Sequence, residues 1–189
     1  MKEGIKKPFY TDVLMAGFGG QGLMFIGKLL AYTGMKEGKN VTWIPSYGPE
    51  MRGGKANCTV VISKEEIASP VITSPHALII MNNPSLEAFE PKLKSGGVLI
   101  WNASLVTKQI KRKDITAIPV RANELASQVG EEKTANMVML GAYVAYTGVV
   151  AKEALKEALK EFLGAKKRRF FSANVKAFEK GMKSVPNVE

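Results

Sequence analysis

The sequence predicts an α/β protein with a three-layer, mostly parallel Rossmann-like sheet, a small antiparallel excursion and a helical C-terminal part. Before residue 136, short apolar runs alternate with helix-like stretches, which is the pattern of parallel strands joined by crossover helices. A glycine-rich turn at residues 17–22 joins the first predicted strand to the first predicted helix, as is common in sheets of this class. From residue 136 onward the pattern is helical throughout.

The length of 189 residues predicts one domain over residues 1–189, with a core at 10–163 and a helical C-terminal extension at 164–189. The hydrophobic content of 46% is ordinary for a globular protein and predicts a sizeable core. No stretch reaches the roughly 20 apolar residues of a membrane span, and no apolar segment follows the charged N-terminus as in a secretory signal. The single cysteine, Cys58, fits a reducing compartment. We therefore expect a cytoplasmic protein without membrane contact.

The formal net charge of +10, from 27 basic and 17 acidic side chains, favours anionic partners such as nucleic acid, acidic proteins or phosphorylated small molecules. A solvated lysine-rich surface accounts for the charge equally well. The basic residues are scattered and form no dense aromatic–basic strip, so we expect no nucleic acid among the partners. The densest basic cluster, residues 166–169, is either a steering element for an anionic partner or a solvated break between helices.

The first unit is a predicted strand, helix and strand. Residues 12–16 form a short apolar run of the buried-strand type. A helix over 21–37 follows, and Gly38 ends it as a suitable C-cap residue. Residues 40–45 form the next short strand. A right-handed crossover is the default connection within such a unit.

Residues 46–57 interrupt this pattern with three glycines, a proline and three charged side chains, so we predict an irregular loop there. Residues 58–63 resume as a strand. A second strand of an antiparallel excursion is predicted at 67–72, where Pro70 restricts it to a sheet edge.

The α/β pattern resumes after this excursion. Apolar segments predict strands at 77–81, 98–102 and 116–120. Asn83 is the predicted cap of a short helix with Pro84 at its first position. The later predicted helices are a short one at 122–129, an uncharged one at 137–150 that is buried in the core or covered by another subunit, an amphipathic one at 151–163, and a last one at 170–182.

The glycine turn has the G-x-G-x-x-G spacing of a dinucleotide site, but a nicotinamide site also needs an acid near the end of the second strand. Pro45 and Ser46 stand at that place, and the nearest acid, Glu50, lies inside the predicted loop. The glycines therefore serve tight turning and close packing, or the approach of a partner or a phosphate to backbone N–H groups. Gln21 either points outward or caps its own helix. The residues of this glycine loop are Gly17, Gly19, Gly20, Gln21 and Gly22.

Groups for demanding chemistry are scarce in this sequence. An iron–sulfur cluster commonly needs four cysteines, and the chain has one. The single histidine, His76, is expected to be a loop residue rather than part of a triad or a zinc site. Cys58 begins an apolar strand and is expected to be buried and inert. We therefore assign no catalytic residue and no metal site, and expect any cofactors to be carried by other subunits.

Two segments are more specific together than either is alone: Gly-Phe-Gly-Gly-Gln-Gly at 17–22 and Thr-Trp-Ile-Pro-Ser-Tyr-Gly-Pro-Glu-Met-Arg-Gly-Gly at 42–54. In this combination they resemble the gamma subunit of the 2-oxoacid:ferredoxin oxidoreductases. The resemblance runs from residue 12 to about residue 160. Shorter pieces agree with it, namely Ser-Pro at 69–70, Met-Asn-Asn-Pro-Ser at 81–85, Phe-Glu-Pro at 89–91 and Lys-Ser-Gly-Gly at 94–97.

The resemblance implies a role in a multisubunit enzyme. Members of this family convert a 2-oxoacid and coenzyme A (CoA) to acyl-CoA and carbon dioxide, and they reduce ferredoxin. Thiamine diphosphate and iron–sulfur clusters are held by partner subunits, so this chain would be an accessory α/β subunit without a redox cofactor. The second segment is closer to the 2-oxoglutarate and branched-chain (2-oxoisovalerate) members than to pyruvate members. Isolated from its partners, the chain is expected to form a homodimer.

We expect the predicted loop at 46–57 to reach the active-site region of such a complex. Arg52 would meet an anionic group or a carboxylate of a partner subunit, because an arginine fork binds such groups well. An internal salt bridge with Glu50 is the other interpretation of Arg52. The alternative function is that of a free-standing dinucleotide-binding protein. The residues of the predicted partner-facing loop are Ser46, Tyr47, Gly48, Pro49, Glu50, Arg52, Gly53, Gly54 and Asn57.

Overall fold

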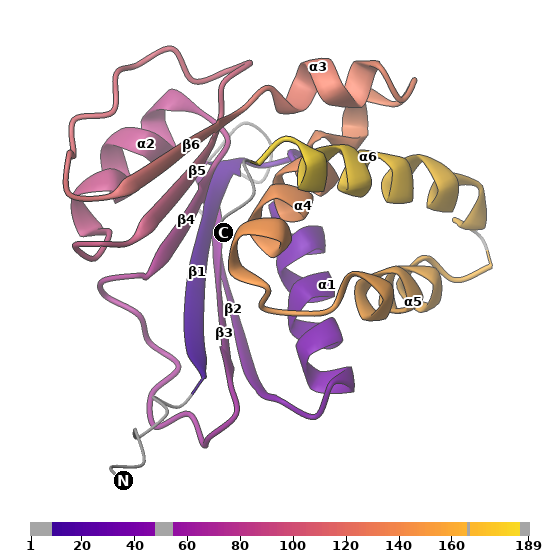
Figure 1. The fold of residues 1–189 in the computed structure, drawn as a ribbon, viewed down its shortest axis with the longest axis horizontal. Helices are drawn as coiled ribbons and strands as arrows, with labels where there is room; N and C mark the ends of the chain where they lie inside the picture. The colour runs from indigo at the N-terminus through magenta and orange to yellow at the C-terminus, as the bar shows by residue number, and fades with distance from the viewer. Residues whose placement is uncertain (1–8, 48–54, 166, 186–189) are drawn as a thin grey trace, which may run out of the picture.

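A six-stranded mixed sheet forms the centre of the computed structural model, which describes residues 9–47, 55–165 and 167–185 (Figure 1). The strand order is β2-β3-β1-β4-β5-β6. Strands β1, β4, β5 and β6 run parallel, while β3 lies antiparallel between β1 and β2. The strands are β1 (Tyr10–Phe18), β2 (Asn40–Tyr47), β3 (Lys55–Ser63), β4 (Ala77–Ile80), β5 (Val98–Asn102) and β6 (Thr116–Val120).

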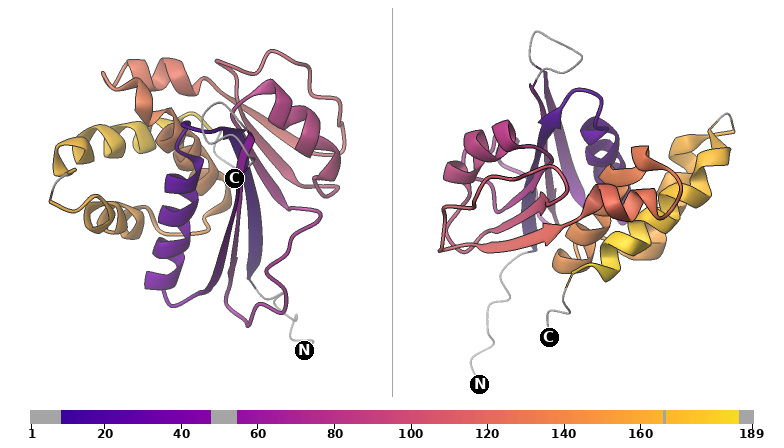
Figure 2. Two further views of the ribbon diagram at one scale, coloured as in Figure 1. Left: turned by 180° about the vertical axis from the view of Figure 1, so that it is seen from behind. Right: turned by 90° about the horizontal axis from the view of Figure 1, so that it is seen from above.

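Helices cover both faces of the sheet and give the three layers that the sequence predicts (Figures 1 and 2). Helix α2 packs on one face, over β1 and β4. Helices α1 and α4 lie on the other face, where α5 packs on α1 and α6 packs on α4. The predicted fold class is confirmed. The helices are α1 (Leu23–Lys36), α2 (Asn83–Phe89), α3 (Ala122–Ser127), α4 (Ala135–Thr147), α5 (Lys152–Leu163) and α6 (Phe171–Lys183), with 3₁₀ turns η1 (Glu90–Lys92), η2 (Glu132–Thr134) and η3 (Arg168–Phe170).

The antiparallel excursion is a hairpin of β2 and β3, and its limits differ from the prediction. Strand β2 continues to Tyr47 and β3 begins at Lys55, so the prediction of a loop over 46–57 is wrong at both ends. Strand β3 pairs with β1 on one side and with β2 on the other, and these two ladders of backbone hydrogen bonds extend it. Residues 48–54, between the two strands, lie outside the described residues.

Two further sequence predictions are wrong. The segment 67–72 forms no strand, because β3, the strand before it in the chain, already pairs with β1 and β2 on its two sides and offers it no free edge. The cap of α2 is Asn82 rather than Asn83, because Asn82 Oδ1 accepts a hydrogen bond from Ser85 N at 2.9 Å. Pro84 still lies in the first turn of α2, where its missing N–H costs nothing.

The sheet divides the hydrophobic core into two parts. Val13 and Met15 of β1 face the layer of α1 and α4, whereas Leu14 and Ala16 face that of α2, as the alternation of a strand requires. All residues from 135 to 144 of the uncharged helix α4 are buried within this chain. Among the described residues, no helix combines the length and the apolarity needed to cross a bilayer.

Helices α4 and α6 cross with their backbones in contact. A Cβ atom at Gly141 would lie 2.0 Å from the carbonyl oxygen of Phe178, and one at Gly181 would lie 1.9 Å from that of Val138. Both distances are far below a permitted carbon–oxygen contact, so each helix needs glycine at this crossing. The side chain of Phe178 is fully buried, which makes α6 part of the larger core.

Cys58 lies on β3 beneath α1. A Cβ atom at Gly27 of α1 would lie 2.5 Å from Cys58 Sγ, so glycine at this position allows α1 to pack directly against the sulfur atom. Cys58 is fully buried, and this burial raises the pKa of its thiol to about 12. The thiol therefore stays protonated and unreactive at physiological pH, as the sequence predicts.

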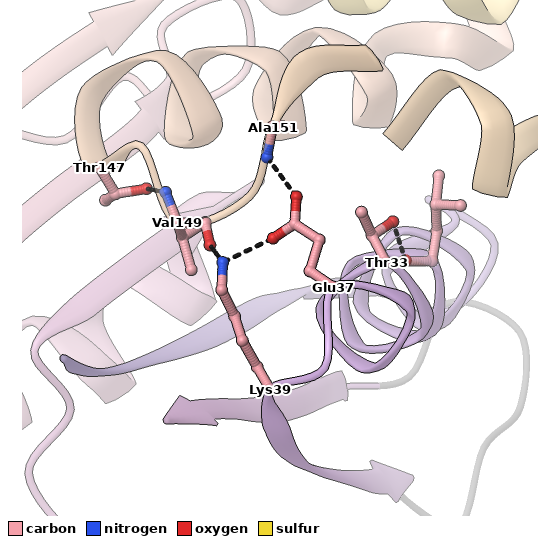
Figure 3. Close-up of polar contacts among 7 residues, drawn as sticks. Thr33, Glu37, Lys39, Thr147, Val149 and Ala151 are labelled. Carbon is pink, nitrogen blue, oxygen red and sulfur yellow. Dashed lines mark hydrogen bonds and ion pairs between the residues drawn. The ribbon is translucent and has the colours of Figure 1, made fainter. Parts of the chain in front are cut away.

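A small network of hydrogen bonds joins the end of α1 to the connection between α4 and α5 (Figure 3). The Glu37 carboxylate accepts hydrogen bonds from Ala151 N at 2.7 Å and from Lys39 Nζ at 2.6 Å. Lys39 Nζ also donates to Val149 O at 2.6 Å. The side chains of Lys39 and Glu37 are only 15% and 18% exposed, so these charge-assisted bonds are stronger than those of an open surface pair. They fix the direction in which the chain leaves α4.

Replacing Gly141 or Gly181 by alanine should lower the free energy of unfolding, because the added methyl group would force α4 and α6 apart. Overpacking of this kind costs roughly 1–3 kcal/mol and occasionally more. Urea or thermal unfolding of the purified chain measures the loss. Gly34→Ala is the matched control on α1, since its Cβ would meet only the side-chain tips of Ile62 and Val41, at 3.1 and 3.2 Å. Equal losses at positions 34 and 141 would contradict the backbone contact.

The native chain should resist thiol-specific alkylation of Cys58 at about pH 8, because a buried, protonated thiol is a poor nucleophile. Mass spectrometry of chain labelled over time measures the rate. The same chain unfolded in guanidinium chloride is the control and should label completely. Rapid stoichiometric labelling of the folded chain would show that the thiol is accessible.

Candidate functional site

The glycine loop and the last described residues of the segment 42–54 lie at the same end of the sheet, where β1 and β2 end. Phe18, at the end of β1, pairs with Lys55, and Tyr47, at the end of β2, pairs with Ala56. The glycine loop therefore starts beside Lys55, the first residue of β3, and the end of β2 lies on the other side of β3. This edge carries the carboxyl ends of β1, β2, β4, β5 and β6.

The predicted partner-facing loop is described only at its two ends. Ser46 and Asn57 pair with each other across the hairpin, and Ser46 is exposed. The backbone of Tyr47 belongs to β2. The rest of this loop, namely Gly48, Pro49, Glu50, Arg52, Gly53 and Gly54, lies outside the described residues.

The side chain of Gln21 turns back onto the glycine loop. The side-chain Oε1 of Gln21 accepts a hydrogen bond from Phe18 N at 2.7 Å, and the backbone N–H of Gln21 donates to Phe18 O at 3.2 Å. A Cβ atom at Gly17 would lie 2.4 Å from Gln21 Oε1, so Gly17 makes room for this side chain. Gln21 thus neither points outward nor caps α1; it closes the turn that precedes the helix.

The start of α1 is fixed by Asn136, a residue that the sequence analysis did not identify. Gly22 is the cap position of α1 and has the left-handed φ of 75°. Asn136 Nδ2 donates to Gly22 O at 3.1 Å, and it would lie 2.2 Å from a Cβ at Gly22. Asn136 comes from the first turn of α4 and is 6% exposed. No sequence pattern links two residues that stand 114 positions apart.

A pocket of about 330 Å³ opens beside the glycine loop. From this edge the chain passes from β1 into α1 on one face and from β4 towards α2 on the other. Such a switch point, outside the carboxyl ends of the strands, is where open α/β sheets bind ligands. The pocket is lined by Gly20, Gln21, Gly22, Met81, Leu105, Asn123, Glu132, Lys133, Ala135 and Asn136.

The electrostatic character of this pocket comes from two helices and two charged side chains. The first residues of α4 and the cap of α1 line the pocket, and the cap residues Gly22 and Thr134 make no side-chain hydrogen bond to their helices. In the first turn of α4, Asn136 Oδ1 accepts a hydrogen bond from Met137 N. Each helix N-terminus carries the equivalent of roughly half a positive charge. Lys133 and Glu132 line the pocket from η2. Gly20 has a φ of 102° and open space around it, so an anionic group can approach the loop there.

A dinucleotide in its usual pose does not fit this edge. Strand β3 lies between β1 and β2, so the end of β2 stands two strands, about 10 Å, from the glycine loop. Pro45 and Ser46 occupy the end of β2, where the ribose-binding acid of a nicotinamide site would stand. The described residues at this strand end thus offer no carboxylate for a ribose.

His76 lies just before β4, at the opposite end of the sheet, where the parallel strands β1, β4, β5 and β6 begin. Its Nδ1 is 2.6 Å from Asp12 Oδ2, and its backbone N–H donates to Asp12 Oδ1 at 2.8 Å. Lys94 Nζ is 3.0 Å from His76 Nε2. Asp12 is 1% exposed, so this cluster is a polar link between β1 and β4. In the described part of the chain, no serine, threonine or cysteine side chain hydrogen-bonds to His76, which leaves a catalytic triad without a nucleophile.

The donor groups do not fit an iron–sulfur cluster or a zinc ion. Within residues 9–47, 55–165 and 167–185, no three His, Cys, Asp or Glu side chains come close enough together to hold a metal. Cys58 offers a single buried thiol, whereas a cluster commonly needs four thiolates.

The comparisons with known proteins identify a family. The family model described as pyruvate ferredoxin/flavodoxin oxidoreductase matches residues 12–184. Among curated relatives, the 2-oxoglutarate synthase subunit KorC of Methanothermobacter marburgensis is 35% identical in an alignment of 179 positions that covers 90% of this chain and 94% of that protein. The ketoisovalerate oxidoreductase subunit VorA of Methanothermobacter thermautotrophicus is 38% identical over 171 residues, or 89% of this chain and 35% of that protein. The chain thus spans about a third of the length of this second relative.

Solved structures agree with this result. The keto/oxoacid ferredoxin oxidoreductase gamma subunit from Geobacter sulfurreducens has a TM-score of 0.79 and 34% identity, covering 92% of this chain and 97% of that one. The 2-oxoglutarate:ferredoxin oxidoreductase from Magnetococcus marinus, solved with 2-oxoglutarate, coenzyme A and succinyl-CoA bound, has a TM-score of 0.85. At 23% identity over 95% of this chain and 32% of that one, it supports the fold alone. The gamma-subunit resemblance is confirmed, and this chain belongs to the pyruvate ferredoxin/flavodoxin oxidoreductase family.

Proposed function

We propose that this chain is the gamma subunit of a complex that oxidatively decarboxylates a 2-oxoacid with CoA and passes the electrons to ferredoxin. The proposal is supported by near full-length matches to KorC and to the Geobacter gamma subunit. The substrate would be 2-oxoglutarate or a branched-chain 2-oxoacid, because the relatives above are named for 2-oxoglutarate and ketoisovalerate. The form of the segment at 42–54 favours the same two substrates.

The chain would be an accessory subunit, with thiamine diphosphate and iron–sulfur clusters on its partners. Its single cysteine supports this division of labour, because Cys58 is buried under α1 with a protonated thiol. The residues of this chain would then contribute binding and shape to the shared site, while partner subunits supply the reacting groups. Ferredoxin would meet the chain only through the assembled complex, and in isolation the chain would form a homodimer.

The observation that carries the site proposal is the pocket at the carboxyl edge of the sheet, between the N-termini of α1 and α4. Backbone N–H groups at two helix starts, the open face of Gly20 and the ammonium group of Lys133 suit a phosphate. CoA is the phosphate-bearing substrate of the proposed reaction. We propose that its anionic part, or an acidic group of a partner subunit, enters here.

The segment 48–54 would act from the same edge of the sheet. Its flanking residue Lys55 pairs with Phe18 at the end of β1, where the glycine loop begins, and Tyr47 lies one strand further away, at the end of β2. Arg52, within this segment, would bind an anionic group of CoA or a carboxylate of a partner subunit, since a guanidinium fork donates two parallel hydrogen bonds.

Reconstitution of the chain with the other subunits of its complex tests the overall function. Reduction of ferredoxin that depends on both 2-oxoacid and CoA should appear only when this chain is included. Ferredoxin absorbance follows the reaction, with 2-oxoglutarate, 2-oxoisovalerate and pyruvate supplied in turn. The chain alone is the control and should be inactive. Turnover by the lone chain, or micromolar binding of NAD(H), NADP(H) or FAD to it, would instead support the free-standing dinucleotide-binding alternative.

Lys133→Gln tests the pocket within that complex. Loss of an exposed charge beside a phosphate should raise the KM for CoA roughly two- to fivefold, and should leave kcat unchanged if the lysine only aids binding. The effect should shrink as salt is added, because salt screens exposed charges. Lys176→Gln is the matched control, since Lys176 is exposed on α6 and does not line the pocket. Equal KM values for both variants and the wild type would place the CoA phosphates elsewhere.

A further inference from the structure

The glycine loop is held by two side chains, one at each end. Gln21 Oε1 binds Phe18 N at the strand end of the loop. At the helix end the carbonyl oxygen of Gly22 accepts two hydrogen bonds, one from Ile26 N at 3.2 Å and one from Asn136 Nδ2 at 3.1 Å. The first is the opening bond of α1, whereas the second comes from α4.

The amide of Asn136 contacts both helix starts at once. Its Oδ1 accepts a hydrogen bond from Met137 N at 2.8 Å, which satisfies an N–H group in the first turn of α4. Its Nδ2 donates to the cap residue of α1. A carbonyl needs a donor and an N–H needs an acceptor, so this network admits one orientation of the amide. Aspartate could accept from Met137 N, but it could not donate to Gly22 O.

The hydrogen bonds from Asn136 to Gly22 O and from Met137 N to Asn136 form a bridge between the two helix starts, and burial restricts its movement. Asn136 is 6% exposed, and its amide fills the space that a side chain at Gly22 would need. The two helix ends are positive, so their mutual approach is unfavourable unless a neutral, hydrogen-bonding group lies between them. The amide of Asn136 supplies that group.

We infer that Asn136 is a positioning residue, which sets the spacing between the N-termini of α1 and α4 and so keeps the glycine-loop pocket in its binding form. The inference deepens the proposed function and rests on it for the ligand, but the bridge itself is testable without any ligand. Asn136 lines the pocket together with Gly20 and Lys133, but its Nδ2 and Oδ1 each hydrogen-bond within the chain, so Asn136 acts through Gly22.

Two backbone amides of the full chain report on the bridge directly. Ile26 N–H reports on the α1 start, because it bonds to Gly22 O, and Met137 N–H reports on the α4 start, because it bonds to Asn136 Oδ1. Residue-resolved hydrogen exchange by NMR measures both. In Asn136→Ala, which removes both the donor and the acceptor, both amides should exchange roughly tenfold faster, the loss expected for one hydrogen bond. In Asn136→Asp only Ile26 should exchange faster, since the carboxylate still accepts from Met137 N.

Asn174→Ala is the matched control, because Asn174 Nδ2 donates to Phe170 O at 2.7 Å in α6, away from the pocket. It should leave both amides unchanged. Wild-type exchange at Ile26 in both Asn136 variants would overturn the inference, as would equal acceleration of both amides in Asn136→Asp. In the assembled complex, the Asn136 variants should raise the KM for CoA about tenfold at little cost in kcat, whereas the control should not.

Failure of the proposed function and failure of the inference about Asn136 give different experimental results. If the wild-type complex shows no CoA-dependent turnover, the proposed function fails while the exchange result still decides the bridge. If turnover is present and exchange changes as expected, but the KM for CoA stays at its wild-type value in both Asn136 variants, the bridge is structural only and its positioning role is overturned.

Discussion

The mixed pairing of β1 decides where the other parts of this molecule lie. On one side β1 continues the parallel series of β4, β5 and β6, and on the other side it pairs antiparallel with β3. The antiparallel partner must enter the sheet at the edge where β1 ends, so the start of β3 meets the glycine loop. The same partner separates β2 from β1, and this separation removes the geometry by which a second strand reaches a bound ribose. One pairing choice thus both brings the start of β3 to the glycine loop and separates the two strands that hold a nicotinamide dinucleotide in its usual pose.

Helix α4 transmits this arrangement to the helical layer. Its first turn contacts the cap of α1 through Asn136, and its middle touches the backbone of α6 at Gly141. The connection after its last turn is held by Glu37 and Lys39 from the end of α1 (Figure 3). Helices α1 and α4 are therefore joined at both ends by hydrogen bonds. A helix without a charged side chain is well suited to this place, because it can be buried on every side without stranding a charge.

Most of the fold could be predicted from local patterns, and the errors have a common cause. Strands at 98–102 and 116–120 were predicted with their observed limits, because their apolar runs end at glycines or polar residues. The limits of β2 and β3 were missed, because a strand end depends on the neighbour that pairs with it, and glycine and proline at 48–54 dominate the local composition. The segment 67–72 contains isoleucine and valine, which favour strands, but the preceding strand β3 is already paired on both sides. Pairing partners are a property of the whole sheet, and propensity alone does not contain them.

The site was predictable only where it is local. The glycine loop is one continuous motif that can be recognised in the sequence, whereas Asn136 and Lys133 line the same pocket from a segment that is distant in sequence. The structure also explains why the glycine spacing is a poor guide to the ligand. The Gln21 side chain occupies the volume that a Cβ at Gly17 would need, and the Asn136 side chain does the same at Gly22. Two of the glycines therefore allow contacts within the chain. Around Gly20 the space is open. A spacing of glycines shows that something approaches the backbone, and side chains of the same protein satisfy that condition as well as a cofactor does.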